Sequence, residues 1–288
     1  MYADKMSPSM KAAITQTVER RGRQHNYNLK NDITPKTIQK PLPILGEDTN
    51  DILNGTDQNS KKGNRRLVGK EINKQSDYIN KIKNGLLNYK EERKLGLTWS
   101  KRLSERSFLA VNGTLLASKL AISNGIGCHL GGGTHHSHYD YGSGFCVFND
   151  LAYTALKLIE SKIVKKILIF DCDVHQGDGT AEICKNDTNI FTCSIHASNN
   201  FPSIKAESDL DIGLDDTISD ENYLEKIKFA LATCSKNIEP DLVLYDAGAD
   251  VHKNDKLGRL NISGKCILER DLEVLNFFKR KDLSLIHI

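Results

Sequence analysis

Apolar and polar positions alternate with two different periods along most of this chain. From about residue 76 onward, short apolar runs are separated by segments whose apolar residues recur every three or four positions. The apolar runs predict strands at 126–130, 167–170, 190–195, 242–246 and 283–288. The other segments predict helices at 77–87, 104–123, 148–161, 179–184, 221–234 and 268–279. Such alternation is typical of an α/β fold, in which a mainly parallel sheet carries helices on both faces.

The first 75 residues have a different pattern. Residues 7–27 predict a helix, with Ser7 and Ser9 as candidate N-caps. Residues 44–75 are rich in polar turn formers and have few apolar side chains to bury, which predicts a disordered linker. We therefore expect an N-terminal segment at 1–43, a linker at 44–75 and a folded domain at 76–288.

Composition and charge exclude several classes of protein. With 39% hydrophobic and 27% charged residues, the chain resembles soluble globular proteins, and no apolar run is long enough to span a membrane. The seven cysteines never form C-x-x-C, which indicates reduced thiols in a cytoplasmic protein. Residues 1–43 carry a net charge of +5 and the remainder −2, so a nucleic-acid partner is not expected for the long part.

Polar clusters follow four of the predicted strands. The carboxyl ends of parallel strands meet at one rim of a sheet, where ligands bind. Many ionisable groups in one crevice are tolerated best around a divalent cation. The alternative is that these are ordinary polar turn residues, each solvated separately. The side chains expected at this rim are His135, His136, Asp171, Asp173, His175, Asp178, His196 and Asp250.

The segment KKILIFDCDVHQGDGT carries the densest of these clusters. Residues two apart on an extended chain point the same way, so Asp173 and His175 face one spot and Asp171 lies beside them. A carboxylate and an imidazole are two of the ligands of a catalytic zinc site. Gly177 and Gly179 then allow a tight turn into a short helix. A strand followed by a polar turn without metal is the alternative interpretation.

Five motifs together resemble a known family. GGGTHHSHYDYGSGFCVFND, FDCDVHQGDGT, FTCSIHASNNFP, SDLDIGL and YDAGADVHKNDKLGRLNIS match, in order and spacing, the zinc-dependent histone deacetylase superfamily. The last motif and the FP–SDLDI stretch are most similar to class IV and related bacterial members. The resemblance covers about 76–288 and implies a three-layer arginase/deacetylase-like fold with a mainly parallel sheet.

The resemblance also implies roles for individual residues. The zinc ligands would be Asp173, His175 and Asp250. The imidazole pair beside the metal would be His135 and His136, oriented by Asp171 and Asp178 respectively. The walls of a narrow acyl-lysine tunnel would be Gly144, Phe145, Phe201 and Leu257. A structural monovalent cation would lie at the main-chain oxygens of Asp171, Asp173 and His175, near Ser194 and Ile195.

These roles imply a zinc-dependent deacetylase that hydrolyses the acetylated lysine of a protein or a small acetylated amine. His136 would act as general base and His135 as electrostatic support. One alternative is an arginase-like hydrolase with two manganese ions, because D-x-D-x-H is shared with that family. The other is a non-catalytic remnant that binds a metal or acyl-lysine.

The resemblance fails at both ends of the domain. Family members begin with further elements before the region that matches Asp77, and their G-G-G-Y turn would follow Ile288. We therefore expect a fold incomplete at both ends. The missing tyrosine donates a hydrogen bond to the developing oxyanion, and loss of such a donor slows a reaction on the order of a hundred- to a thousandfold. We therefore expect weak activity or none.

The N-terminal segment has its own resemblance. Residues 1–43, MYADKMSPSMKAAITQTVERRGRQHNYNLKNDITPKTIQKPLP, are similar to the end of the second helicase domain in the helicase-type component of excinuclease ABC. No G-x-x-x-x-G-K-[ST] loop occurs in the chain, so the segment implies no helicase activity.

Overall fold

The computed structural model describes residues 8–31, 65–279 and 284–287. It divides the chain into two compact units, Met1–Lys61 and Lys62–Ile288. In the first unit, helix α1 spans Pro8–Lys30 and confirms the helix expected at 7–27. Most of the expected linker, residues 44–64, lies outside the described residues.

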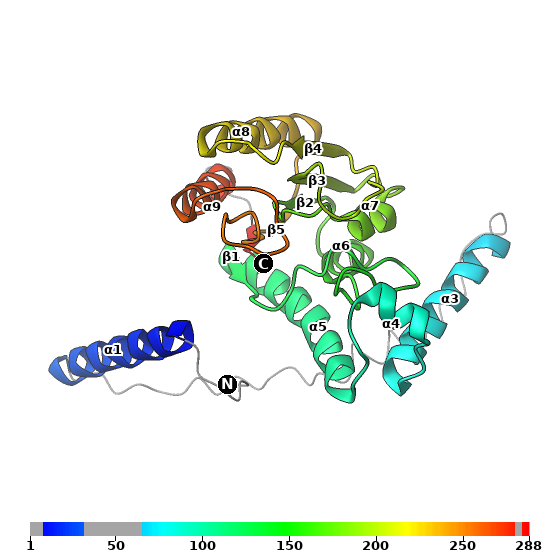
Figure 1. Ribbon diagram of the computed structural model, residues 1–288, viewed down its shortest axis with the longest axis horizontal. Coiled ribbons are helices and arrows are strands. Elements are labelled where there is room, and N and C mark those ends of the chain that lie inside the picture. Colours follow the sequence, from blue (N-terminus) through cyan, green and yellow to red (C-terminus); the bar gives the residue numbers. More distant parts are fainter. Residues whose placement is uncertain (1–7, 32–64, 280–283, 288) are drawn as a thin grey trace. The chain divides into compact units, whose positions relative to one another are not determined.

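The second unit is built on one parallel sheet (Figure 1). Its order is β1-β6-β5-β2-β3-β4, and every neighbouring pair is parallel. β2 and β5 lie at the centre, and their residues are buried along the whole strand, as expected for strands covered on both faces. The strands are β1 Ile126–Cys128, β2 Ile167–Asp171, β3 Ile190–Ala197, β4 Leu210–Leu214, β5 Leu242–Asp246 and β6 Ser284–His287.

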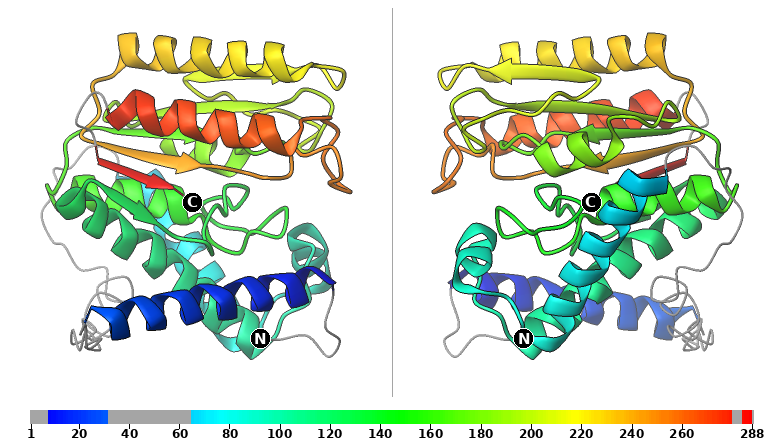
Figure 2. Two further views of the ribbon diagram at one scale, coloured as in Figure 1. Left: turned by 90° about the vertical axis from the view of Figure 1, so that its left-hand side faces the viewer. Right: turned by 90° about the vertical axis from the view of Figure 1, so that its right-hand side faces the viewer.

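Different helices cover the two faces of the sheet (Figure 2). Because successive strand residues point to opposite faces, Phe170 and Tyr245 pack with α8 and α9, whereas Ile169 and Leu244 pack with α5 and α6. This confirms the predicted three-layer α/β fold. The helices of this unit are α3 Arg65–Asn84, α4 Tyr89–Leu95, α5 Lys101–Asn124, α6 Asp150–Glu160, α7 Asp178–Cys184, α8 Asp220–Asn237 and α9 Gly264–Lys279.

Three elements differ from the sequence prediction. α3 begins at Arg65, within the segment 44–75 for which we expect a linker, and apolar residues recur at helical spacing in 65–75 without a proline. α4 was not predicted, although Asn88 caps it through a capping box with Glu91. β4 was missed because it is a short edge strand in which Asp211 and Gly213 alternate with the apolar residues.

No helix in the described ranges is long and apolar enough to cross a membrane. All seven cysteines fall within those ranges, and none of them is in a disulfide.

Candidate metal centre and active site

Two adjacent strands bring the three predicted metal ligands together. Asp173 and His175 follow β2, and Asp250 follows β5, its neighbour in the sheet. His175 Nδ1 lies 3.0 Å from Asp173 Oδ1 and 3.0 Å from Asp250 Oδ2. One ligand atom from each residue falls within 4.8 Å of the others. An imidazole nitrogen with two carboxylate oxygens is a donor set that suits a zinc ion with an open position.

Backbone contacts hold these two loops against each other. The Val174 amide donates to Asp250 Oδ1 over 2.9 Å, and the His175 amide donates to Asp173 Oδ1 over 2.8 Å. Gly248 allows the close approach, because a Cβ at this position would lie 2.5 Å from the Cα of Asp173. The carboxylates are therefore fixed in place by protein contacts rather than left free.

The electrostatics of this group fit a site that exchanges a proton for a cation. Burial opposes a charge on His175, but its hydrogen bonds to Asp173 and Asp250 raise the pKa of the imidazole to about 9. Burial raises the pKa of Asp250. A proton on His175 Nδ1 thus lies between the two carboxylates, at the point where the three donor atoms converge. A divalent cation replaces such a proton when it binds.

The two predicted histidines lie beside the metal group. Each has its own carboxylate: His135 Nδ1 is 2.7 Å from Asp171 Oδ2, and His136 Nδ1 is 2.7 Å from Asp178 Oδ1. Their Nε2 atoms lie 3.1 Å apart, and both rings are buried. The carboxylates fix the tautomers, because each Nδ1 carries the proton that its acid accepts.

The environments of the two imidazoles shift their pKa values in opposite directions. Burial alone would lower the pKa of His135, but the charges of Asp171 and Asp173 raise it well above its usual value. Burial and the charge of His135 lower the pKa of His136 to about 4. These shifts favour a cationic His135 and a neutral His136, whose unprotonated Nε2 can accept a proton.

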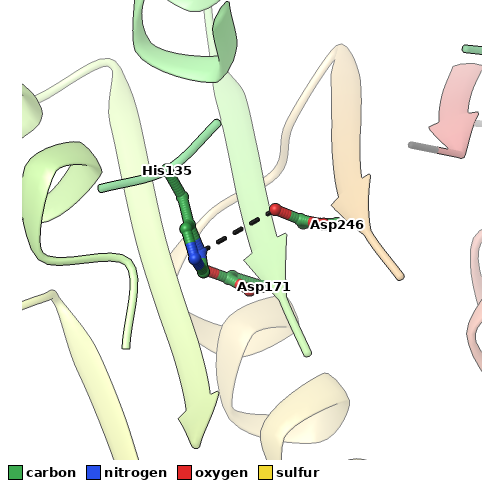
Figure 3. A group of neighbouring side chains, drawn as sticks. All are labelled: His135, Asp171 and Asp246. Carbon is green, nitrogen blue, oxygen red and sulfur yellow. Dashed lines mark hydrogen bonds and ion pairs between the residues drawn. The ribbon is translucent and has the colours of Figure 1, made fainter. Parts of the chain in front are cut away.

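A further acid, Asp246, lies next to His135 and was not predicted as a site residue (Figure 3). Its Oδ2 is 3.8 Å from His135 Nδ1, and within the described part of the chain this oxygen has no hydrogen-bond partner. Burial, and then the charge of Asp171, raises the pKa of Asp246 well above its usual range. The position was predicted as the end of a strand and lies in the motif YDAGAD, but no role was assigned to it. The parallel register, which pairs Asp171 with Asp246, is the signal that would have found it.

Ligand atoms of His135, Asp171 and Asp246 also lie within 4.8 Å of one another. His135 Nδ1 lies 2.7 Å from Asp171 Oδ2 but 3.8 Å from Asp246 Oδ2, so these atoms converge less evenly than those of the first group, where His175 Nδ1 lies 3.0 Å from both carboxylates. We interpret this cluster as a hydrogen-bonded charge network rather than a second metal site.

The predicted tunnel residues surround His136 in part. The ring of Phe201 meets that of His136 edge-on, with centroids 4.8 Å apart. Gly144 has a φ of +51°, and a Cβ there would lie 2.5 Å from Cδ2 of His136. Phe145 follows with a positive φ and is largely exposed, as is Leu257. The Leu257 carbonyl accepts a 2.9 Å hydrogen bond from Asn200, the neighbour of Phe201.

His196 does not belong to either group of possible metal ligands among the described residues. It is buried on β3, where Nδ1 lies 3.0 Å from Ser194 Oγ, and burial lowers the pKa of the ring to about 4. This histidine, which the strand-end pattern placed at the rim, is a satisfied interior residue.

Comparisons with known proteins identify the family of this chain. The family model described as histone deacetylase domain matches residues 60–287, and the one described as ultra-violet resistance protein B matches residues 1–43. An uncharacterized protein of Picosynechococcus sp. is 42% identical over 206 residues, which are 72% of this chain and 69% of that protein.

Two named relatives are more distant. Histone deacetylase 2 of Arabidopsis thaliana is 34% identical over 61% of this chain and 46% of its own length. The acetoin utilization protein AcuC of Staphylococcus aureus is 33% identical over 70% of this chain and 57% of its own length. The chain thus spans about half the length of these two relatives.

A solved structure supports the fold. The crystal structure of an HDAC homolog complexed with SAHA superimposes with a TM-score of 0.65 and 24% identity, over 73% of this chain and 62% of that one. The region that the family model matches includes the sheet, its helices and the loops that carry the metal group and the histidine pair. From these matches we conclude that the chain belongs to the histone deacetylase domain family.

Proposed function

We propose that this protein is a zinc-dependent deacetylase that hydrolyses the amide of an acetylated lysine or a similar acetylated amine. The observation that carries the proposal is the convergence of Asp173, His175 and Asp250 beside two histidines, each with its own carboxylate. When bound, a zinc ion would polarise the amide carbonyl and lower the pKa of a water molecule towards neutrality.

The two histidines have different roles: His136 transfers protons, and His135 stabilises negative charge. His136 is the neutral member, and its Nδ1 is held by Asp178, so Nε2 accepts the proton of the attacking water and returns it to the leaving amine. His135 keeps its positive charge against Asp171 and stabilises the negative charge that develops on the substrate oxygen.

A slender acyl chain suits the approach to this pair. Phe201 stands edge-on to His136, and Gly144 lies against the same ring. The aromatic wall of Phe201 favours the methylene chain of a lysine, and the amide then reaches the histidines at the inner end. SAHA, which is bound in the solved structure of the HDAC homolog, can serve as a probe for binding in this tunnel.

The test is zinc-dependent release of acetate from an acetyl-lysine peptide by the full chain. We expect release above that of the His136→Ala variant and its loss on chelation. SAHA binding that requires zinc, without acetate release, would instead favour a non-catalytic acyl-lysine-binding protein. If folded, zinc-loaded protein neither binds SAHA nor releases acetate, the proposal is contradicted.

Two further assignments belong to the proposal. A monovalent cation at the main-chain oxygens of Asp171, Asp173 and His175 is supported by the resemblance and stays a prediction. A reducing, cytoplasmic location is supported by the seven cysteines, none of which is in a disulfide.

A further inference from the structure

A buried arginine contacts the loops that carry the metal group. Arg270 of α9 is fully buried and is the largest of the fully buried side chains in the described ranges. Its helix covers the sheet face opposite α5 and α6 (Figure 2). Burial of a guanidinium is costly unless its donors are hydrogen-bonded. The acceptors of Arg270 therefore identify the segments of the chain that it joins.

The guanidinium donates to main-chain carbonyls of two different loops. Nη1 donates to the Gly248 carbonyl over 2.8 Å and to the Cys172 carbonyl over 3.3 Å. Nη2 donates to the Ala247 carbonyl over 3.1 Å. Cys172 directly precedes Asp173, and the other two residues lie just before Asp250. One rigid cation therefore joins the two segments that present the carboxylates of the metal group.

A second residue of α9 sets the orientation of the guanidinium. Asp271 Oδ1 accepts from Nε of Arg270 over 2.9 Å and from the Tyr245 hydroxyl over 2.6 Å. Tyr223 completes the surroundings, with its hydroxyl 3.3 Å from Nη1. The planar fork of arginine is matched to several acceptors at once, whereas a lysine ammonium offers a single point of charge.

We propose that Arg270 is a positioning residue for the metal centre: it fixes the Asp173 loop against the Asp250 loop and thereby sets metal affinity. The inference rests on the proposed function in one respect, namely that these carboxylates bind zinc. Loss of the arginine frees three carbonyls on the two loops, so the carboxylates no longer stand at a fixed separation.

The test compares metal affinity with stability. Zinc affinity is measured by competition with a chromophoric chelator, and Co²⁺ absorption reports the coordination geometry. The variants are Arg270→Lys and Asp271→Asn, each measured against the wild type. The matched control is Phe278→Leu, which loses buried volume on the same helix but lies two turns away, against Phe170.

We expect Arg270→Lys to lose at least tenfold in zinc affinity and to change the Co²⁺ spectrum. Phe278→Leu, with a comparable loss of unfolding free energy in the metal-free protein, should stay within twofold of the wild type. If Arg270→Lys does not fold, Asp271→Asn decides the matter, because it leaves the guanidinium in place but removes its orienting charge; we expect a loss of threefold or more.

Unchanged zinc affinity in the folded variant, or a loss no greater than that of Phe278→Leu, overturns the role of Arg270. That result leaves the proposed function intact if the wild type binds one zinc ion. A wild type that binds no zinc overturns both.

Discussion

Asp171 and Asp246 are paired across the two central strands of the sheet, and both carboxyl groups face His135. Only Asp171 hydrogen-bonds the imidazole, over 2.7 Å; the nearer oxygen of Asp246 remains 3.8 Å away and buried. Two ionised carboxylates this close in the interior repel each other strongly. Burial raises the pKa of both acids, and that of Asp246 well above its usual range, so we expect Asp171, which has the hydrogen bond to His135, to be the ionised one.

Replacement of Asp246 by Asn tests this charge assignment. The pKa of Asp246 is raised in the folded state, so the group favours folding below its unfolded pKa of about 3.9 and loses that contribution as pH rises through the folded value. At pH 7 the metal-free Asp246→Asn protein should therefore have a free energy of unfolding in urea at least as large as that of the wild type. The difference in free energy should increase with pH. The exposed Asp77→Asn variant is the control and should show no such trend.

An opposite result for Asp246→Asn is also informative. A loss of more than about 2 kcal/mol at pH 7 would mean that the carboxylate is ionised and that His135 depends on it.

The protonated state of His175 predicts how zinc affinity varies with pH. Because its pKa is about 9 in the metal-free protein, zinc must displace a proton from Nδ1 at neutral pH. Apparent affinity should rise about tenfold per pH unit between pH 6 and 8. Calorimetric titrations in buffers of different ionisation enthalpy should show about one proton released per zinc. An affinity that does not change over this range contradicts the assignment.

Asp178→Asn tests the orientation of His136. The carboxylate holds the proton on Nδ1, so its amide replacement can present a donor there and stabilise the wrong tautomer. We expect kcat to fall about ten- to a hundredfold, with zinc content unchanged, since such orienting partners have effects of this size. A variant that keeps full kcat shows that His136 does not need Asp178.

Gly144→Ala tests the contact between the tunnel turn and His136. Its Cβ would lie 2.5 Å from the imidazole at a φ of +51°. Gly125 is the matched control, because it has a φ of +88° and open space around its Cβ position. Both variants should lose about 1–2 kcal/mol of stability from the left-handed backbone, but only Gly144→Ala should lose deacetylation. Equal activity in the two variants would show that the turn does not shape the site.

The sequence predicted those features of the fold and site that depend on residues within or directly after a single strand. The apolar runs predicted β1, β2, β3, β5 and β6, and the spacing of two predicted that Asp173 and His175 converge. These features depend on local geometry alone, which the order of residues determines.

The features that were missed depend on contacts between distant parts of the chain. Asp246 reaches His135 only because β5 pairs with β2 in a given register. Arg270 reaches the metal loops only because α9 packs against that face of the sheet. Asp246 stands in the motif YDAGAD, but its contact with His135 follows from the strand pairing and not from the motif itself. Arg270 is a charged residue in an amphipathic helix, and such residues most often face solvent.

A single metal site, made by Asp173, His175 and Asp250, underlies all of these expectations. The most direct measurement is the number of zinc ions bound per chain, by elemental analysis after removal of excess metal. We predict one zinc for the wild type and for Asp246→Asn, and none for Asp250→Asn. Two metals per chain, or a stoichiometry that falls with Asp246→Asn rather than with Asp250→Asn, would contradict a single site and favour a binuclear, arginase-like centre.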